Sequence, residues 1–345
     1  MALNGLLPCY IDGVFVDTKQ YVNNINPVNG QVISKLCEAT PELIDQAVKG
    51  AKAALKGPWS KMSVTQRCDL LHKVADRMIE RQNEFIEAEI ADTGKSLFQV
   101  ETIDIPRGAA NFKTFADMAK FHCGETFITE TANGEKALNY SVNKPLGVVA
   151  VISPWNLPLL LATWKVAPAL ACGNCVILKP SEETSSTATL LAQVMDEVGV
   201  PKGVFNLILG RGSIVGDYLT GHPNVDAVTF TGASTTGQHI MRSIAQGVKP
   251  ISFELGGKNS AIVFNDADLE KAIAGVVRST FTNCGQVCLC TEKVFVHRDI
   301  ARTFIDGLKL AASQIKIGYP KEAEVFLGPL VSKAHQEKVL SYYQL

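Results

Sequence analysis

The 345-residue sequence has no long uninterrupted apolar run and no excess of charge of either sign. Its most apolar region, Leu146–Trp164, is broken by Pro154, Asn156 and Pro158, whereas a membrane span needs about 18 nearly continuous apolar residues. The 33 basic and 34 acidic residues give a formal net charge of −1, without the clustered positive excess that nucleic acids bind. We therefore predict neither a membrane protein nor a nucleic-acid-binding protein.

Targeting and disulfide signals are also scarce. The segment Met1–Gly13 lacks a basic stretch followed by a long apolar core, so we expect no secretory signal. Nine cysteines are too few, and odd in number, for a disulfide scaffold, which favours reduced thiols in the cytoplasm. Two pairs of cysteines have a spacing that could supply zinc ligands: Cys172 with Cys175, and Cys284 with Cys288. However, the first pair runs directly into an apolar strand, so we expect no metal.

The composition that is present suits a globular chain with a large core, with 46% hydrophobic and 19% charged residues. The length suggests about two domains. Alternating residues over 10–36 predict short strands and hairpins. Helical spacing predicts helices over 41–55, 65–93 and about 106–120. Residues 122–144 are polar and turn at Asn133-Gly134, which predicts an antiparallel excursion from the main body.

The pattern of apolar residues changes at residue 146. Short apolar runs follow one another, the first four separated by helical stretches: Val148–Ile152, Val176–Leu178, Val204–Leu209, Ala227–Phe230, Ile251–Phe253 and Ala261–Phe264. This pattern is typical of a parallel sheet covered on both faces, and ligands bind beyond the carboxyl ends of such strands. Polar and glycine residues stand at those ends: Ser153–Asn156, Lys179–Glu182, Gly210–Gly212, Thr231–Gly237 and Glu254–Gly257.

Three residues could carry chemistry. Cys288 follows a helical stretch in a predicted loop, where a thiolate nucleophile would be partly exposed; a small core residue is the alternative. Glu254 ends an apolar strand, where a poorly solvated carboxylate could be a general base or could anchor backbone N–H groups. Asn156 lies beside two prolines and could donate to an oxyanion or simply form a turn. Cys284 and Cys290 flank the first of these and could modulate it or be passive.

Two further segments could hold a nucleotide. Lys179 and Glu182 offer one cation and one acceptor to a ribose or phosphate, although a capping box with Ser181 is the alternative. Gly232 and Gly237 join a strand to a helix, whose N-terminal N–H groups could bind pyrophosphate. The fingerprint Gly-x-Gly-x-x-Gly is absent, so this turn alone is weak evidence.

Taken together and in this order, the segments resemble the NAD(P)-dependent aldehyde dehydrogenase superfamily over essentially the whole chain. The resemblance rests on five motifs: Ser153–Asn156, Lys179–Glu182, Phe230–Gly232, Glu254–Lys258 and Gly285–Cys288. It implies a doubly wound parallel α/β sheet, as a Rossmann-like cofactor domain, with part of a second α/β catalytic domain. The implied division is 1–121 and 145–253 for NAD binding, 122–144 for an oligomerisation hairpin, and 254–345 for an incomplete catalytic domain.

The resemblance also implies roles. Cys288 would attack the aldehyde, Asn156 would hold the oxyanion, and Glu254 would activate the water that hydrolyses the thioester. An acidic residue at the position of Glu182 favours NAD over NADP. The implied cofactor contacts are Ser153, Pro154, Trp155, Lys179, Glu182, Gly212, Phe230, Gly232, Ser234 and Leu255. The family often has a serine where Ala233 stands, so Ser234 or backbone N–H groups would replace that contact.

Residues 103–112, 155–159 and 163–165 look like the muconate-semialdehyde branch of the superfamily, which acts in the degradation of aromatic compounds. Arg107 would then hold the substrate carboxylate bidentately, unless it is a solvated helix residue. Betaine aldehyde, a cation, fits badly beside it. A CoA-acylating relative is disfavoured by Glu254, and a cysteine hydrolase by the lack of histidine in the strand-end motifs. A non-catalytic binding or structural fragment is a further alternative.

Family members continue well beyond the position that matches Leu345. We therefore expect little or no activity and poor solubility from the 345-residue chain, because part of its core would lack a covering layer. At full length we expect a homo-oligomer, either a dimer or a tetramer, with a small aldehyde as its only other partner.

Overall fold

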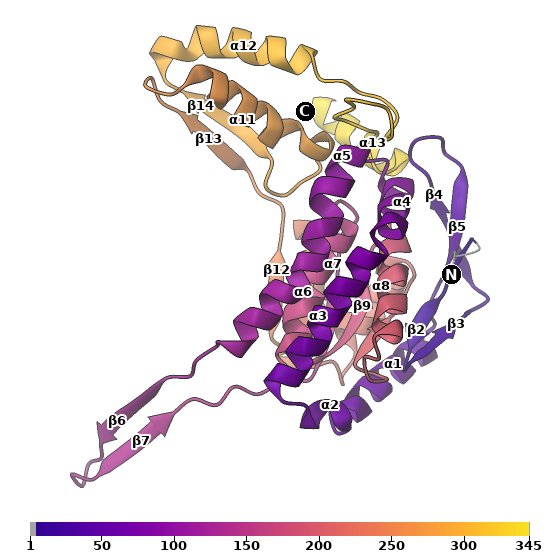
Figure 1. Ribbon diagram of the computed structural model, residues 1–345, viewed down its shortest axis with the longest axis vertical. Coiled ribbons are helices and arrows are strands. Elements are labelled where there is room, and N and C mark those ends of the chain that lie inside the picture. The colour runs from indigo at the N-terminus through magenta and orange to yellow at the C-terminus, as the bar shows by residue number, and fades with distance from the viewer. Residues whose placement is uncertain (1–4, 345) are drawn as a thin grey trace.

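The computed structural model describes residues 5–344, and its centre is a seven-stranded sheet in the order β12-β11-β8-β9-β10-β2-β3 (Figure 1). Five strands run parallel: β8 (Val148–Ile152), β9 (Cys175–Lys179), β10 (Phe205–Leu207), β11 (Ala227–Thr231) and β12 (Ile251–Glu254). Beside β10, two N-terminal strands extend the sheet antiparallel: β2 (Cys9–Ile11) and β3 (Val14–Val16). The predicted sheet is confirmed, and its strand order reverses between β8 and β11, where such sheets bind ligands.

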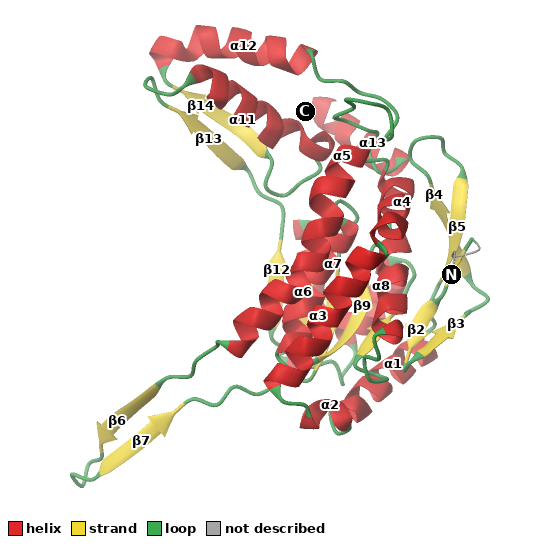
Figure 2. Cartoon of the chain, viewed as in Figure 1, coloured by secondary structure: helices red, strands yellow, loops and turns green. Residues whose placement is uncertain are grey.

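Helices cover both faces of this sheet (Figure 2). Two pack directly on the strands, α7 (Pro158–Ala171) and α8 (Ser186–Glu197), and two lie over them, α3 (Val64–Glu80) and α6 (Ile105–Lys120). The opposite face carries α1 (Pro41–Ala54), α9 (Asp217–Gly221) and α10 (Ser234–Ile244). Right-handed crossovers explain this division, because the chain leaves β8 in one direction and later returns to its other side.

The region 65–93, predicted as one helix, forms two, because α3 ends at Glu80 and α4 spans Gln82–Thr93. Between them, Arg81 leaves the helical backbone angles (φ −100°, ψ 15°). Its side chain is only 5% exposed and pairs with Glu84 and with Glu197 of α8. A buried guanidinium needs such partners. The apolar stripe continues through both helices, so its spacing did not reveal the break.

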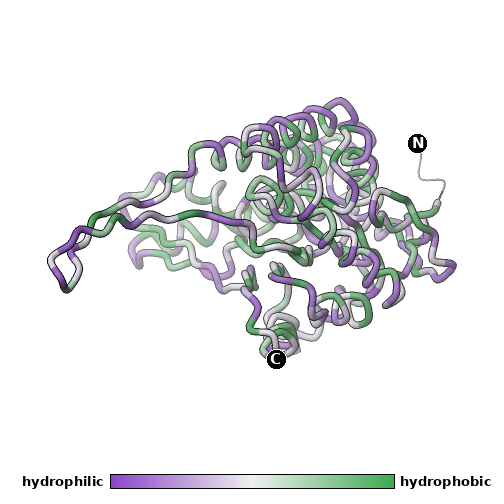
Figure 3. The backbone as a smooth tube through the Cα atoms, turned by 90° about the horizontal axis from the view of Figure 1, so that it is seen from below, coloured by the Kyte–Doolittle hydropathy of each residue, from purple (hydrophilic) through white to green (hydrophobic). Residues whose placement is uncertain are grey.

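Two smaller β elements flank the sheet. In the N-terminal segment β1 (Leu6–Leu7), β5 (Val32–Cys37) and β4 (Tyr21–Ile25) form a three-stranded sheet. The predicted excursion is an antiparallel hairpin of β6 (Thr126–Glu130) and β7 (Lys136–Tyr140). This hairpin projects as a long arm away from the body (Figures 1 and 3). Its predicted role in oligomerisation stays a prediction.

After β12 the chain leaves the sheet through Gly256 and Gly257. The run predicted at Ala261–Phe264 therefore lies outside it, as β13 (Asn259–Val263) paired with β14 (Thr291–Val296). Three helices complete this part: α11 (Leu269–Phe281), α12 (Ala301–Ser313) and α13 (Lys333–Ser341). Short turns of helix elsewhere include α2 (Pro58–Lys61), α5 (Leu97–Gln99) and the π-helical turns Val100–Asp104 and Gly212–Gly216. In residues 5–344 no helix is both long and apolar enough to span a membrane.

Candidate active site

A cleft of about 580 Å³ opens at the carboxyl ends of β8, β11 and β12, where the sequence pattern predicted the candidate residues to lie. Its walls come from five segments: 154–156, 231–233, 254–258, 284–288 and residues of 330–342. Cys288, Asn156 and Glu254 all line it. Chain segments more than a hundred residues apart therefore converge on one cleft.

Cys288 lies on a tight loop, 282–290, which we call the nucleophile loop. After α11 ends at Phe281, three consecutive residues adopt left-handed backbone angles, with φ of 53° at Asn283, 58° at Cys284 and 72° at Gly285. Two of them are not glycine, and each such residue costs about 1–2 kcal/mol. Strain of this kind persists where surrounding contacts over-determine the conformation, which is common at functional sites. The turn leaves Cys288 half-buried in the cleft.

Side-chain amides hold the nucleophile loop against the sheet. Asn283 donates to the carbonyl of Asn156 (3.0 Å), and Gln286 donates to the carbonyl of Asn283 (2.9 Å). In return, the Nδ2 of Asn156 donates to the Gln286 carbonyl at 2.8 Å. The Val331 N–H donates to Oε1 of Gln286 (3.1 Å). Sequence reasoning missed Asn283 and Gln286, although two buried amides three residues apart beside a candidate cysteine were a usable signal.

This network orients the amide of Asn156. One of its two N–H groups is used on Gln286, so the second is free to meet a substrate oxygen. Its Oδ1 is buried and finds no hydrogen-bond partner within the described part of the chain. A carboxamide anchored at one hydrogen can donate the other without reorganising, which is what an oxyanion site requires.

The neighbouring cysteines are poor candidates for the nucleophile. Burial raises the pKa of the Cys284 thiol to about 11, and its Sγ donates to the Gly328 carbonyl at 3.1 Å. Burial also raises the pKa of Cys290, whose side chain is packed away from solvent. Of the three thiols in the nucleophile loop, Cys288 is the one placed to react.

The predicted setting of Glu254 is wrong in one respect: its carboxylate is exposed rather than poorly solvated. The reason is its strand, because β12 is the edge of the seven-stranded sheet and has no neighbour on one side. A buried cation lies beneath this end of the sheet. Lys165 of α7 donates to Oγ1 of Thr229 (2.9 Å), and burial lowers its pKa while nearby Glu254 opposes that shift.

Lys179, Glu182 and Gly212 form a second group beyond β9 that lies outside the lining of the cleft. Lys179 Nζ pairs with Glu182 at 3.0 Å, and the Gly212 N–H donates to the other carboxylate oxygen at 3.2 Å. Burial lowers the pKa of Lys179. Burial raises the pKa of Glu182, but the charge of Lys179 and the hydrogen bonds from Lys179 and from backbone N–H groups together outweigh burial, and the pKa is lowered. The pair is therefore charged and preorganised, as polar ribose contacts require.

The other candidate cofactor residues divide into lining and packing positions. Pro154, Trp155, Gly232 and Leu255 line the cleft, and Ser234 begins α10 at its edge. Phe230 instead packs beneath the cleft. Its ring centroid lies 6.1 Å from that of Phe253, and its side chain is buried. Two buried hydroxyls at these strand ends find no partner within residues 5–344, Oγ of Ser153 and Oγ1 of Thr231. Unsatisfied buried hydroxyls beside a cleft are what a polar ligand would complete.

His335 is a cleft residue that sequence reasoning did not find. It lies on α13, more than forty residues after the nucleophile loop, and its ring is 4.5 Å from that of Trp155. Burial lowers its pKa, and Lys338 adds to that effect. His335, Lys338 and Tyr342 all line the cleft at helical spacing, and this periodicity was the available signal.

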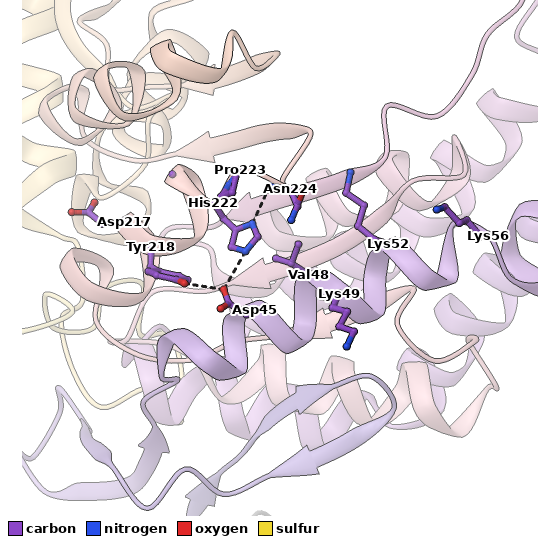
Figure 4. A pocket seen from close by; sticks show the side chains of 11 residues that line it. Asp45, Val48, Lys49, Lys52, Lys56, Asp217, Tyr218, His222, Pro223 and Asn224 are labelled. Atoms are coloured by element: carbon purple, nitrogen blue, oxygen red, sulfur yellow. Dashed lines mark hydrogen bonds and ion pairs between the residues drawn. The ribbon is translucent and has the colours of Figure 1, made fainter.

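Arg107 stands apart from the cleft. It lies in the first turn of α6, its side chain is exposed, and it is not among the described residues that line the cleft. A larger hollow of about 950 Å³ lies at the amino ends of the strands (Figure 4). There Asp45 accepts from Tyr218 (2.8 Å) and His222 (3.1 Å) beside lysines of α1. It contains none of the predicted site residues, so the smaller cleft is the candidate site.

A doubly wound sheet whose carboxyl ends gather a half-buried thiol, an anchored carboxamide and a carboxylate beside a helix N-terminus is typical of a nucleotide-binding enzyme. Residues 15–345 match the Aldehyde dehydrogenase family. The chain belongs to that family. In residues 5–344 no group of three or more histidine, cysteine, aspartate or glutamate side chains is placed to hold a metal.

Similar proteins include a 2-hydroxymuconic semialdehyde dehydrogenase from Pseudomonas sp. (strain CF600). It is 54% identical over 97% of this chain and 70% of its own length. Human 2-aminomuconic semialdehyde dehydrogenase is 42% identical over 98% of this chain and 68% of its own length. Among solved structures, an aldehyde dehydrogenase from Bacillus cereus in complex with NAD+ superposes with a TM-score of 0.95 at 38% identity. That match covers 99% of this chain and 70% of the other.

Proposed function

We propose that this protein oxidises an aldehyde to a carboxylic acid with NAD, through a covalent intermediate on Cys288. The observation that carries the proposal is the convergence of Cys288, Asn156 and Glu254 on one cleft. No pair of these residues is close in the sequence, so their meeting is a property of the fold. Membership of the Aldehyde dehydrogenase family supports the same chemistry.

The residues act in sequence. The Sγ of Cys288 attacks the aldehyde carbon and forms a thiohemiacetal, whose oxyanion accepts hydrogen bonds from the free N–H of Asn156 and the backbone N–H of Cys288. After oxidation the adduct is a thioester. Glu254 takes a proton from water, which attacks the thioester carbon and releases the acid and the thiolate. The exposure of Glu254 suits this last step, because the water must reach it.

NAD, when bound, supplies the hydride acceptor for the oxidation. The chain offers it the buried hydroxyls of Ser153 and Thr231, which have no hydrogen-bond partner among residues 5–344, the N-terminus of α10 at Ser234, and the Lys179–Glu182 pair. Pro154, Trp155, Gly212, Gly232 and Leu255 would complete the contacts. A charged Glu182 disfavours a cofactor that carries an extra phosphate at the ribose.

We propose 2-hydroxymuconate semialdehyde as the substrate. The similarity to muconic semialdehyde dehydrogenases supports this, at 54% and 42% identity for the two relatives named above. Arg107 would pair with the carboxylate at the far end of such a substrate, while Cys288 takes the aldehyde.

We further propose a cytoplasmic homo-oligomer assembled through the β6–β7 hairpin. Along this arm large apolar side chains are exposed, including Phe127, Ile128, Leu138 and Tyr140. Isolated two-stranded hairpins gain stability from a surface that covers them. All nine cysteines are free, in keeping with a reducing compartment.

Formation of NADH would be followed with 2-hydroxymuconate semialdehyde, betaine aldehyde and hexanal, each for the wild type and for Cys288→Ser. Alkylation of Cys288 by iodoacetamide, read by peptide mass spectrometry, adds a measurement that needs no turnover. We expect aldehydes and NAD to protect Cys288 and to leave the exposed Cys172 unprotected. Equal labelling of Cys288 with and without these ligands would overturn the proposed chemistry. A preference for betaine aldehyde would overturn the proposed substrate.

A further inference from the structure

Arg107 lies in the first turn of one helix, and Asn156 lies just before the start of a second helix that packs beside it. Arg107 is in the first turn of α6, and α7 begins at Pro158, two residues after Asn156. The two helices pack along their length. The separation between the proposed carboxylate-binding group and the oxyanion donor therefore depends on how closely α6 approaches α7.

Gly108 of α6 lies directly against Leu159 of α7. A Cβ atom at this position would lie 3.1 Å from Cγ and 3.2 Å from Cδ2 of Leu159, which is tighter than most such contacts. Gly108 is buried and directly follows Arg107. The absence of a side chain at Gly108 lets the first turns of the two helices meet without displacing Leu159. A methyl group at position 108 must displace either the Leu159 side chain or the start of α6, and in the second case Arg107 moves with it.

Asn111 links α6 to α7 through side-chain hydrogen bonds. It is buried and lies four residues after Arg107, one helical turn further along α6. Its Nδ2 donates to the Leu160 carbonyl (3.1 Å) and to Oγ1 of Thr163 (3.0 Å). Since Thr163 donates in turn to the Leu160 carbonyl, the three groups close a small buried network. This network resists both sliding and rotation of α6 on α7.

The start of α6 is also fixed from the other side. Asp104, which precedes α6, pairs with Lys95 at 2.7 Å, and both side chains are almost completely buried. Further along, the rings of Phe115 and Trp164 meet edge to face with centroids 5.7 Å apart. The backbone around Arg107 is therefore held at four places, whereas its side chain is exposed.

We propose that Gly108 and Asn111 are specificity-determining positioning residues. They fix the distance from Arg107 to Asn156, and thereby select aldehydes that carry a carboxylate at one particular distance from the aldehyde carbon. The proposal rests on the proposed function, because it assigns the substrate carboxylate to Arg107. A guanidinium pairs bidentately with a carboxylate only over a narrow range of positions, so a small displacement removes the preference.

The test compares two aldehydes of equal chain length, adipic semialdehyde with a terminal carboxylate and hexanal without one. Each forms a reversible thiohemiacetal, so protection of Cys288 from iodoacetamide measures its affinity without turnover. We expect Gly108→Ala and Asn111→Ala to weaken the protection of Cys288 by adipic semialdehyde about tenfold, which corresponds to the loss of a charge-assisted hydrogen bond. Protection by hexanal should be unchanged. Ala110→Ser, on the exposed side of α6, is the matched control and should change neither.

A double-mutant cycle tests whether Gly108 and Asn111 act through Arg107. In an Arg107→Ala background, Gly108→Ala and Asn111→Ala should cause no further loss for adipic semialdehyde. If Arg107→Ala alone leaves the preference for adipic semialdehyde intact, the proposed substrate is wrong. If Arg107→Ala abolishes the preference while both Gly108→Ala and Asn111→Ala retain it, the positioning role is wrong. Because the readout is a ratio of two aldehydes in one variant, partial unfolding cancels.

Discussion

The body of the molecule, residues 5–258, and its C-terminal part, residues 259–344, are built from similar apolar patterns but are packed very differently. The body contains one large buried cluster that includes Phe112 and Phe205. The separate cluster of the C-terminal part has three buried members, Val263, Val276 and Phe304. Large apolar side chains on its two strands remain exposed, including Phe295 at 57%.

The difference follows from sheet architecture. In the body both faces of the sheet carry helices, whereas the β13–β14 pair packs against α11 and exposes its other face. The cleft lies where the two parts meet, so the proposed oxyanion donor Asn156 belongs to the well-packed part and the proposed nucleophile Cys288 to the weakly packed one. Asn283 and Gln286 bridge this boundary, which explains why two buried amides are used there.

The largest expected effect tests the packing contrast directly, with the same substitution in each part. Phe112→Ala should destabilise the chain by about 3–5 kcal/mol, because the side chain is fully buried and leaves a cavity. Phe295→Ala should change the free energy of unfolding by no more than about 0.5 kcal/mol. Urea unfolding followed by circular dichroism gives both values. Equal losses would show that the exposed face of β14 is covered in solution.

A second prediction concerns the bridge between the parts. Gln286→Ala removes two side-chain hydrogen bonds and leaves the Val331 N–H without its acceptor, whereas the Asn283 carbonyl keeps the backbone N–H of residue 286. We expect a loss of about 2 kcal/mol and faster amide exchange in the nucleophile loop. Gln314→Ala, an exposed glutamine in the same part, is the control. If both variants exchange like the wild type, the amide network does not hold the loop.

The pH dependence of stability should arise mainly in the body, where carboxyl groups are buried. Burial raises the pKa of Glu89 from 4.5 to about 7. Since the folded state then holds a proton that the unfolded state has lost, stability is complete below about pH 4.5 and falls as pH rises to about 7. Glu89→Gln should flatten this slope, whereas Glu87→Gln, exposed on the same helix, should not. An unchanged slope in Glu89→Gln would contradict the assignment.

The smallest effect concerns the ring contact across the cleft. The lowered pKa of His335 means that the folded state resists protonation, so stability is complete above the usual value of 6.5 and declines as pH falls below it. His335→Gln should remove this weak decline. Quenching of Trp155 fluorescence, compared between the wild type and His335→Gln across this pH range, reports the contact. Identical pH profiles would place the titration elsewhere.

Several local features follow from the amino-acid sequence alone. Uninterrupted apolar runs predicted β8, β9, β11 and β12 to within two residues, because strands buried on both faces tolerate few polar side chains. Polar residues at their ends predicted where the cleft lies. The helix break at Arg81 and the exposure of Glu254 could not be predicted in this way, because both depend on neighbours that are distant in the sequence.

Local sequence was therefore enough to specify most of the helices and strands, the strand ends that line the candidate active site, and the residue types available there. Which of these residues meet was settled by the packing of the whole chain. His335 reaches Trp155, Asn283 reaches Asn156, and Arg107 stays outside the cleft. The reason is the sequence distance over which each effect acts. Backbone preferences and periodicity act within one helix or strand, whereas burial and hydrogen-bond pairing are set by contacts between elements far apart in the chain.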